Sequence, residues 1–517
     1  MNISETMTRI FLVVGTMILI NTGISWWRGG SDDTVFVAPT QVNEQRVLDL
    51  EVDFLDKETE NPEQLITVDT PIAHMRFTNR GATLAELTCV RTHAHTSMNT
   101  NGENKKQKFT VWDAKDATDR ELNAFLVALD EKTPFYYTLI QHEDGEKLAK
   151  LVFEAKTEQG RIEKQFEISK ELHMLTLTVT VKPKKQTHVR VLWPSPLLKE
   201  LGEDEALSSI VINKNNTFAQ QPEASLDLQR GYLNPGLFGT SDKYFVFALY
   251  KDTQNFAQRA YYKIVNRHVM SFLESKKIEE ETSWNLGFYF GPKETAAMHP
   301  VDPRLEKSLN YGMFSFITRP LVEFLKYIDS YTHNYGWAIV IVTVLLKLLL
   351  FPFTYKSESK MKEFQESQRK LEYVNTKFKD DPEALERARL EHMKKHGVSG
   401  LLGGCLPMML PLPLFIALSG ALNNSLALYR EPFIWWIQDL SKPDPYYVLS
   451  ILAVIAILLS GLGAQGKKGT AAIVMPIVMA LGLGTITAYS SAGLALYICL
   501  NMVLHMGQTK IQRLLGL

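Results

Sequence analysis

Two parts of the chain contain long apolar runs, and a polar stretch of about 300 residues separates them. The first run covers residues 10–27 and ends in two tryptophans. Beyond residue 330, apolar runs follow at about 333–356, 401–428, 446–463, 470–489 and 493–506. A helix that crosses a bilayer needs about 20 mostly apolar residues. The pattern therefore predicts six membrane spans, one near the N-terminus and five in a core over residues 331–517.

Residues 1–30 are predicted to form a retained transmembrane anchor. Their apolar run is longer than that of an ordinary secretory signal, and no small-x-small cleavage pattern follows before Arg28. Arg9, just before the run, places the N-terminus in the cytoplasm and the polar residues that follow on the outer side. A cleaved signal peptide is the alternative interpretation.

The polar middle of the chain divides into a tether and a β-rich domain. Residues 31–70 are acidic and show no sustained period, which is typical of a tether. Over residues 71–300 short runs alternate apolar and polar positions, as Leu175 and Leu177 do among threonines, and turn residues bound them. The pattern predicts a β-sandwich, with a turn at Asn79-Arg80-Gly81 between its first two strands. No nucleophile pairs with a base at a recognisable spacing here.

Residues 303–330 change to a helical period. Five apolar residues share one stripe, and charged residues lie off it; the stripe consists of Ile317, Leu321, Phe324, Leu325 and Ile328. Such a segment directly before a membrane span favours an amphipathic helix that lies in the membrane surface. A core helix of the preceding domain is the alternative.

Residues 356–396 are rich in lysine and arginine among glutamates and carry apolar residues at helical spacing. A short basic loop between two spans is typical of the cytoplasmic side. We therefore expect a cytoplasmic helical hairpin, whose basic residues include Lys377, Lys379, Lys394 and Lys395. The other basic loops fall on the same side, so both termini are predicted to be cytoplasmic.

Composition excludes several classes of function. The net charge of −1 gives no general affinity for nucleic acid, and the three scattered cysteines, Cys89, Cys405 and Cys499, indicate neither a metal site nor a disulfide framework. The glycines near Gly461 resemble nucleotide-binding loops, but Lys468 stands where a phosphate loop needs Ser or Thr to hold magnesium. We therefore expect no catalytic residues, no metal and no cofactor.

Lys347 is the one charge inside the apolar run 333–356. A lysine near the middle of a span costs about 2.5–3.5 kcal/mol on insertion scales, so it is expected to face a hydrophilic recess. Snorkelling toward the charged end at Lys356 is the alternative, but four apolar residues, 348–351, follow Lys347 directly. The predicted core spans contain no Asp or Glu that could pair with Lys347.

Four motifs carry a resemblance to a known family. They are NYGWAIVIVTVLLKLLLFPFT, GGCLPMMLPLPLFIAL, PFIWWIQDLSKPDPYY and SAGLALYICLN, in this order. The chain resembles bacterial YidC-type insertases of the YidC/Oxa/Alb family. The resemblance implies a polytopic α-helical membrane protein of the bacterial inner membrane with a large periplasmic β-sandwich domain. It also implies a five-helix core around a groove that guides nascent membrane proteins into the lipid, alone or beside the Sec translocon.

The resemblance also assigns residues of the groove. Lys347 occupies the place of the family's groove arginine, Thr343 matches a polar groove position, and Tyr497 matches a family tyrosine. Ile498 stands where a second tyrosine is usual. On this basis we expect Lys347 to lie among Thr343, polar groups near Asn423 and Asn424, and Tyr497 or Asn501.

The resemblance also suggests a role for the hairpin 356–396. We expect its lysines Lys377, Lys379, Lys394 and Lys395 to lie near the ribosome or the arriving chain. A purely topological role for these charges is the alternative. Two other classes of function remain open: an anchored carbohydrate-binding or carbohydrate-modifying protein, and a small-molecule transporter, which predicts internal repeats that the spans do not show.

Overall fold

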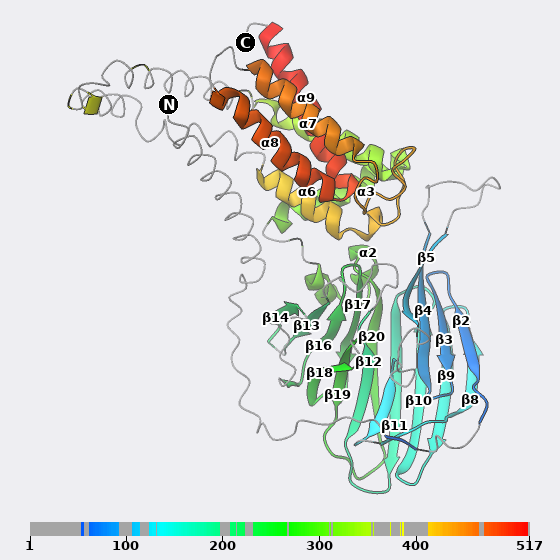
Figure 1. The fold of residues 1–517 in the computed structure, drawn as a ribbon. Coiled ribbons are helices and arrows are strands. Elements are labelled where there is room, and N and C mark those ends of the chain that lie inside the picture. The colour runs from blue at the N-terminus through cyan, green and yellow to red at the C-terminus, as the bar shows by residue number, and fades with distance from the viewer. Residues whose placement is uncertain are drawn as a thin grey trace, which may run out of the picture. The chain divides into compact units, whose positions relative to one another are not determined.

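The computed structural model describes two compact units of the chain (Figure 1). The described residues are 53–55, 61–92, 106–113, 124–130, 132–196, 207–213, 215–222, 231–265, 268–309, 311, 314–352, 412–464 and 470–514, with the single positions 355, 373, 383, 385 and 386. One unit is Gly30–Asn310, and the other joins Met1–Gly29 to Tyr311–Leu517. The predicted anchor 1–30 and nearly all of the predicted hairpin 356–396 lie outside the described residues.

The first unit consists of three β-sheets, in which β1 and β7 are parallel and the other described strand pairs are antiparallel. The nine-stranded sheet has the order β14 (Phe218–Pro222), β13 (Ser208–Ile212), β16 (Leu237–Ser241), β17 (Phe245–Asp252), β20 (Thr282–Pro292), β11 (Met174–Pro183), β10 (Gly160–Ser169), β9 (Leu148–Lys156), β8 (Thr138–Asp144). The seven-stranded sheet has the order β1 (Asp53–Leu55), β7 (Lys132–Pro134), β6 (Leu126–Leu129), β12 (Val189–Pro194), β19 (His268–Glu274), β18 (Arg259–Val265), β15 (Tyr232–Leu233). The four-stranded sheet has the order β2 (Leu65–Asp69), β3 (Ala73–Thr78), β4 (Thr83–Thr92), β5 (Lys106–Asp113).

Aromatic side chains join these sheets into a sandwich. Phe166 of β10 packs against Phe77 of the four-stranded sheet, with ring centroids 5.0 Å apart. Trp193 of the seven-stranded sheet packs against Phe288 of β20 at 5.1 Å. The nine-stranded sheet therefore packs against both smaller sheets. The alternation that predicted the strands is the alternation of burial, since the leucines and valines of β11 are buried and the threonines between them are half-buried.

The sheets begin earlier in the chain than predicted. Strands β1 and β2 lie within residues 31–70, which were expected to be a tether without regular structure. In β2 only Ile66 and Val68 face inward, which is too few residues to reveal a period of two. The turn at Asn79-Arg80-Gly81 does join two strands, but these are β3 and β4 rather than the first two.

A fully buried lysine lies where the three sheets meet. The ammonium of Lys164 in β10 donates to the carbonyl oxygens of Gly81 (2.5 Å), Ala82 (3.1 Å) and Phe125 (2.8 Å). These acceptors belong to the β3–β4 turn and to the residue before β6, and all three residues have positive φ values of 45–72°. Non-glycine residues such as Ala82 and Phe125 adopt this conformation at an energetic cost. Lys164 thus ties one strand to two strained segments of the other sheets.

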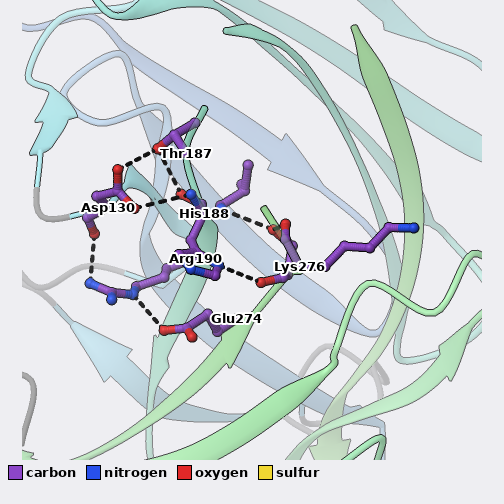
Figure 2. A network of polar contacts seen from close by, with 8 residues as sticks. Asp130, Thr187, His188, Arg190, Glu274 and Lys276 are labelled. Atoms are coloured by element: carbon purple, nitrogen blue, oxygen red, sulfur yellow. Dashed lines mark hydrogen bonds and ion pairs between the residues drawn. The ribbon is translucent and has the colours of Figure 1, made fainter. Parts of the chain in front are cut away.

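A second polar network connects the turn after β6 with β12 and β19 of the seven-stranded sheet (Figure 2). Arg190 of β12 donates from Nε to the Glu274 carboxylate of β19 (2.9 Å) and from Nη1 to the Asp130 carbonyl (2.7 Å). The Asp130 carboxylate accepts from the Thr187 hydroxyl (2.8 Å) and from the His188 backbone N–H (3.0 Å). This network fixes the turn after β6 against β12 and β19, and its arrangement is that of a structural brace.

The predicted helix over 303–330 is two elements in different units. The segment Pro303–Ser308 is a 3-10 helix, η2, which follows the short helix α2 (Thr295–Met298) in the first unit. Arg304 holds η2 on the sheets by donating to the carbonyls of Gly236 (3.1 Å) and Tyr250 (2.6 Å). The amphipathic helix, α3, begins only at Ser315 and ends at Thr332.

The second unit is helical. It contains α3, the helix Tyr335–Pro352, α6 (Leu412–Asn424), η3 (Leu426–Leu428), α7 (Val448–Ala464), α8 (Thr470–Tyr489) and α9 (Ala492–Leu514). Helix α3 buries Leu321 and Leu325, and its Thr318 hydroxyl donates to the Ala417 carbonyl of α6 (3.2 Å). Phe324, which also belongs to the predicted apolar stripe, is 37% exposed.

Among the described helices, Tyr335–Pro352 is long and apolar enough to cross a bilayer by itself. The apolar stretches of the other helices are shorter: Leu414–Asn423, Val448–Leu459, Ile477–Tyr489 and Ala492–Gln508. The count of six spans therefore stays a prediction.

Candidate functional site

Two contacts set the helix Tyr335–Pro352 beside α9. The Lys347 ammonium donates to Oδ1 of Asn501 at 3.3 Å. Eight residues earlier on both helices, Gly493 lies beside Ile339, since a Cβ on Gly493 would be in ordinary van der Waals contact with Ile339 Cδ1 at 3.4 Å. Since the spacing is the same on both helices, they run parallel and in register.

This register brings the other predicted groove residues to one level. Thr343 and Tyr497 both lie midway between the two contacts, so the same offset places them level with each other. Thr343 is buried, and its hydroxyl donates to the carbonyl of Ile339 (2.6 Å). Tyr497 is buried as well, and its ring stacks on Phe415 of α6 with a centroid distance of 6.3 Å.

In the stretches beside the two contacts, the polar side chains of both helices recur at a spacing of four residues. Between Trp337 and Phe351 the polar residues are Thr343 and Lys347, and between Ala492 and Asn501 the strongly polar ones are Tyr497 and Asn501. Residues four apart lie on the same face of a helix. A hydroxyl, an ammonium, a phenol and an amide thus form one polar seam, defined here as Thr343, Lys347, Tyr497 and Asn501.

Burial changes along this seam. On α9 residues 492–499 are all buried, whereas residues 500–507 are half-buried or exposed. On the neighbouring helix Ile339 and Val342 are buried, whereas Leu348 and Leu349 are exposed. Lys347 and Asn501 lie where the packed half of each helix gives way to the more exposed half. Their polar groups can therefore be reached from that half.

Asn423 lies at the other end of this helix pair, away from Lys347. Its side chain accepts from the Ser491 hydroxyl (3.0 Å) and donates to Ser419 (3.2 Å). Ser491 precedes Asn501 by ten residues, about 15 Å along a helix. The expected grouping of Asn423 with Lys347 is therefore not what the structure has. Asn423 lies at the end of α6, just before Ser425 caps η3. Its position in the sequence does not indicate how far along the neighbouring helices α6 places it.

Other residues of the site were missed or are not described. Phe415 and Ser491, which contact Tyr497 and Asn423, were not anticipated, and only the place of Ser491 just before α9 could have indicated it. The side chain of Asn424 and the residues Lys377, Lys379, Lys394 and Lys395 lie outside the described part of the chain.

Within the described residues, no group of three His, Cys, Asp or Glu side chains is arranged to hold a metal ion. The chemistry that the seam offers is hydrogen bonding and positive charge. Such groups can receive polar or anionic parts of another molecule.

Two family descriptions match consecutive parts of the chain. Residues 65–324 match the family described as YidC periplasmic domain, and residues 327–514 match the family described as 60Kd inner membrane protein. Together the matches cover nearly all of the described residues.

Curated relatives share this description over part of their length. The membrane protein insertase YidC of Geotalea daltonii is 36% identical over 278 residues, which are 52% of this chain and 51% of that protein. That of Citrifermentans bemidjiense is 31% identical over 341 residues, or 65% of this chain and 61% of that protein. The chain thus spans about half to three fifths of the length of these curated relatives.

A solved structure, described as an active YidC insertase with its first transmembrane domain resolved, is 17% identical to this chain. It covers 87% of this chain and 93% of its own, with a TM-score of 0.36. This score is too low to establish a shared fold, so the relationship rests on the sequence matches.

Proposed function

Because the chain belongs to the YidC family of membrane protein insertases, we propose that it guides transmembrane segments of nascent proteins into the bacterial inner membrane along its polar seam. The observation that carries this proposal is the hydrogen bond between Lys347 and Asn501 at the point where both helices become more exposed. A polar group placed there is accessible to an arriving chain.

The physical task of an insertase is to lower the cost of moving polar segments through hydrocarbon. A charged residue at the centre of a bilayer costs about 2.5–3.5 kcal/mol on insertion scales. A seam of hydrogen-bonding side chains offers such groups partners part of the way across. The apolar part of the substrate then leaves for the lipid, and its hydrophobicity drives the step. No covalent change is needed.

The topology that fits this function has six spans and both termini in the cytoplasm. The sheet unit then lies in the periplasm, and the end of the bundle with Lys347 and Asn501 is nearer the cytoplasm than the end with Ser491. Helix α3 lies in the periplasmic surface of the inner membrane, where its exposed Phe316, Tyr327 and Tyr331 meet lipid headgroups. The ribosome and the Sec translocon are the partners that supply the nascent chain.

Site-specific crosslinking tests this proposal. A photoreactive diazirine side chain is placed at Thr343 or Tyr497 while a single-span membrane protein is stalled during synthesis. The control position is Leu481 on α8, which is 62% exposed and outside the seam. We expect crosslinks to the nascent chain from both seam positions and none from position 481. A stable protein that gives no seam crosslinks, or equal ones from Leu481, would overturn the proposal.

A further inference from the structure

A short loop between η3 and α7 exposes a tryptophan at its tip. This segment, called here the 430–442 loop, is closed at its centre by a hydrogen bond from the Phe433 N–H to the Ile437 carbonyl (2.9 Å). Trp435 lies between these two residues and is 83% exposed. Its φ of 38° is a conformation that a bulky residue adopts only at an energetic cost. The loop thus holds a large side chain outward in a strained conformation.

The residues on both sides of Trp435 form a packed base. The Phe433 ring lies over Gly336, where any Cβ would overlap it. The Trp436 indole N–H donates to the Asp444 carboxylate (3.1 Å), and Ile437 is buried. Because the base is packed, the loop would lose these contacts if it turned Trp435 inward.

Other exposed aromatic residues lie at the same end of the helical unit. Trp337, in the first turn of the helix Tyr335–Pro352, is 49% exposed, and its ring packs edge-on against Phe433 of the loop (5.7 Å). Three exposed tyrosines lie at the start of α7 and the end of α8: Tyr446, Tyr447 and Tyr489. Tryptophan and tyrosine are enriched where spanning helices meet the membrane surface. Trp435 is therefore at the level of a membrane surface.

The charges of the loop fit the same surroundings. Glu431 is buried, and the Asp439 carboxylate accepts from the backbone N–H groups of Arg430 (3.0 Å) and Ser441 (2.9 Å). The exposed charged side chains of the loop are those of Arg430 and Lys442, which are both basic. Lipid phosphates attract cations. The exposed side of the loop therefore suits phospholipid headgroups.

The loop also contacts the first turns of both helices that carry the polar seam. The carbonyls of Lys442 and Leu440 accept from the N–H groups of Ala492 (2.7 Å) and Gly493 (2.9 Å) at the start of α9. The first N–H groups of a helix have no partner within the helix. The packing at Gly336 holds the same loop on the other seam helix. The position of the loop thus sets the position of both helix starts.

We propose that Trp435 is a membrane anchor, which inserts among phospholipid headgroups and thereby fixes the level of the 430–442 loop and of the start of α9. The proposed topology makes this the periplasmic leaflet. An indole suits the place, because its apolar ring meets acyl chains while its N–H reaches water or a headgroup. Trp435 is thus a positioning residue for the seam, and its partner is lipid rather than substrate.

Quenching by brominated lipids tests the depth of Trp435. The full chain is reconstituted in phosphatidylcholine vesicles that carry bromine either near the headgroup or deep in the acyl chains. Because the chain has eight tryptophans, the emission of Trp435 is the difference between the parent and Trp435→Phe. We expect this emission to be quenched more by the shallow than by the deep bromine.

The matched control is Leu481→Trp in the Trp435→Phe protein. Leu481 is 62% exposed and precedes Tyr489 by eight residues, about 12 Å along α8, so its replacement should be quenched most by deep bromine. Emission of Trp435 that neither lipid quenches would overturn the inference, because a second copy, another protein or water would then surround the ring. Deep quenching equal to that of position 481 would overturn it as well.

Hydrogen exchange tests the positioning of α9. Trp435→Asn keeps a residue that tolerates positive φ but removes the anchor, whereas Trp435→Phe keeps an aromatic ring. In vesicles we expect the amides of Ala492 and Gly493 to exchange at least about threefold faster in Trp435→Asn, since partial burial of a large apolar side chain is worth this much. Trp435→Phe should stay near the parent rate. Equal exchange in all three proteins would overturn the positioning role.

These measurements are separate from the test of the proposed function. Seam crosslinks from Thr343 and Tyr497 without quenching of Trp435 would overturn the anchor and leave the proposed function in place. Quenching of Trp435 without any seam crosslinks would support the anchor and overturn the proposed function.

Discussion

Two lysines show how differently this protein accommodates a charge away from bulk water. Lys164 is fully buried and donates to three backbone carbonyls. Burial lowers its pKa well below the usual range, but three acceptors match an ammonium, because a neutral amine has only two N–H donors. Lys347 is half-buried and bonds a side-chain amide. The first arrangement stabilises a fold, whereas the second leaves the lysine only half-buried.

Replacing Lys164 should destabilise the sheet unit strongly. In Lys164→Met the new side chain fills about the same volume, but the carbonyls of Gly81, Ala82 and Phe125 lose the ammonium that donates to them. A buried polar group that loses its partner costs about 1–3 kcal/mol, so we expect a loss of at least about 2 kcal/mol. Pulse proteolysis of the full chain in a urea series measures it.

The matched control for this change is Lys182→Met on the neighbouring strand β11. Lys182 is exposed, and its ion pair with Glu281 is a surface pair, so its removal should cost less than about 1 kcal/mol. If both substitutions shift the urea midpoint equally, the three carbonyl contacts do not stabilise the junction of the sheets.

Lys347 should act as the charge that attracts acidic parts of a substrate. Lys347→Arg keeps the charge and a donor for Asn501, so insertion should be preserved. Lys347→Leu should impair acidic-tailed substrates more than neutral ones, while leaving the helical unit as stable as before or more stable, because a charge leaves an apolar span. Insertion of paired substrates at equal expression measures the difference. Equal insertion of both substrates by Lys347→Leu would favour the snorkelling interpretation.

At the scale of elements, the sequence predicted those strands and helices that show a regular spacing of apolar residues. Strand β11 contains the alternation of Leu175 and Leu177 with threonines, and the apolar runs predicted at 446–463 and 470–489 begin and end within a few residues of α7 and α8. Strands β1 and β2 were missed because each offers too few inward residues. The start of α3 was also missed, because a helical period continues across the break between Ser308 and Ser315.

What depends on register between elements could not be read from one sequence. The grouping of Lys347 with Asn501 was anticipated as one of several pairings, and only the geometry selects it. Asn423 was grouped with Lys347 because α6 was expected nearby, but nothing in its period indicated which level of the bundle it reaches. Lys164 had a visible signal, since it occupies an inward position between Ile162 and Phe166 in an alternating strand.

The predicted hairpin 356–396 belongs to the same scale, and its role stays a prediction. Reversing the charges of Lys377, Lys379, Lys394 and Lys395 to Glu should weaken ribosome association, and the effect should shrink as salt screens the interaction. The topology should be kept, because many other basic residues remain in the loop. Co-sedimentation with ribosomes across a salt series measures this. Association that is unchanged at every salt concentration would leave these lysines with a topological role only.

At the scale of the molecule, the division into two units follows the change of pattern along the chain. The boundary at Asn310–Tyr311 lies where strand-like alternation has ended and the amphipathic helix has not begun. The segment before it is held by Arg304 on the sheets, and α3 after it packs on α6. These contacts of Arg304 and of α3 are each made within one unit.

From this division we predict that the two units are separable in function. The polar seam lies entirely in the helical unit, so deletion of residues 60–309 should largely preserve insertion. Deletion of Ser315–Thr332 should abolish it, because α3 covers α6 through Leu321, Leu325 and the Thr318–Ala417 bond. Both shortened proteins are scored by rescue of a strain depleted of its own insertase, with membrane levels measured in parallel. If the protein without the sheets is stable in the membrane and yet fails as completely as the one without α3, the sheet unit carries an essential step, and the seam alone does not explain insertion.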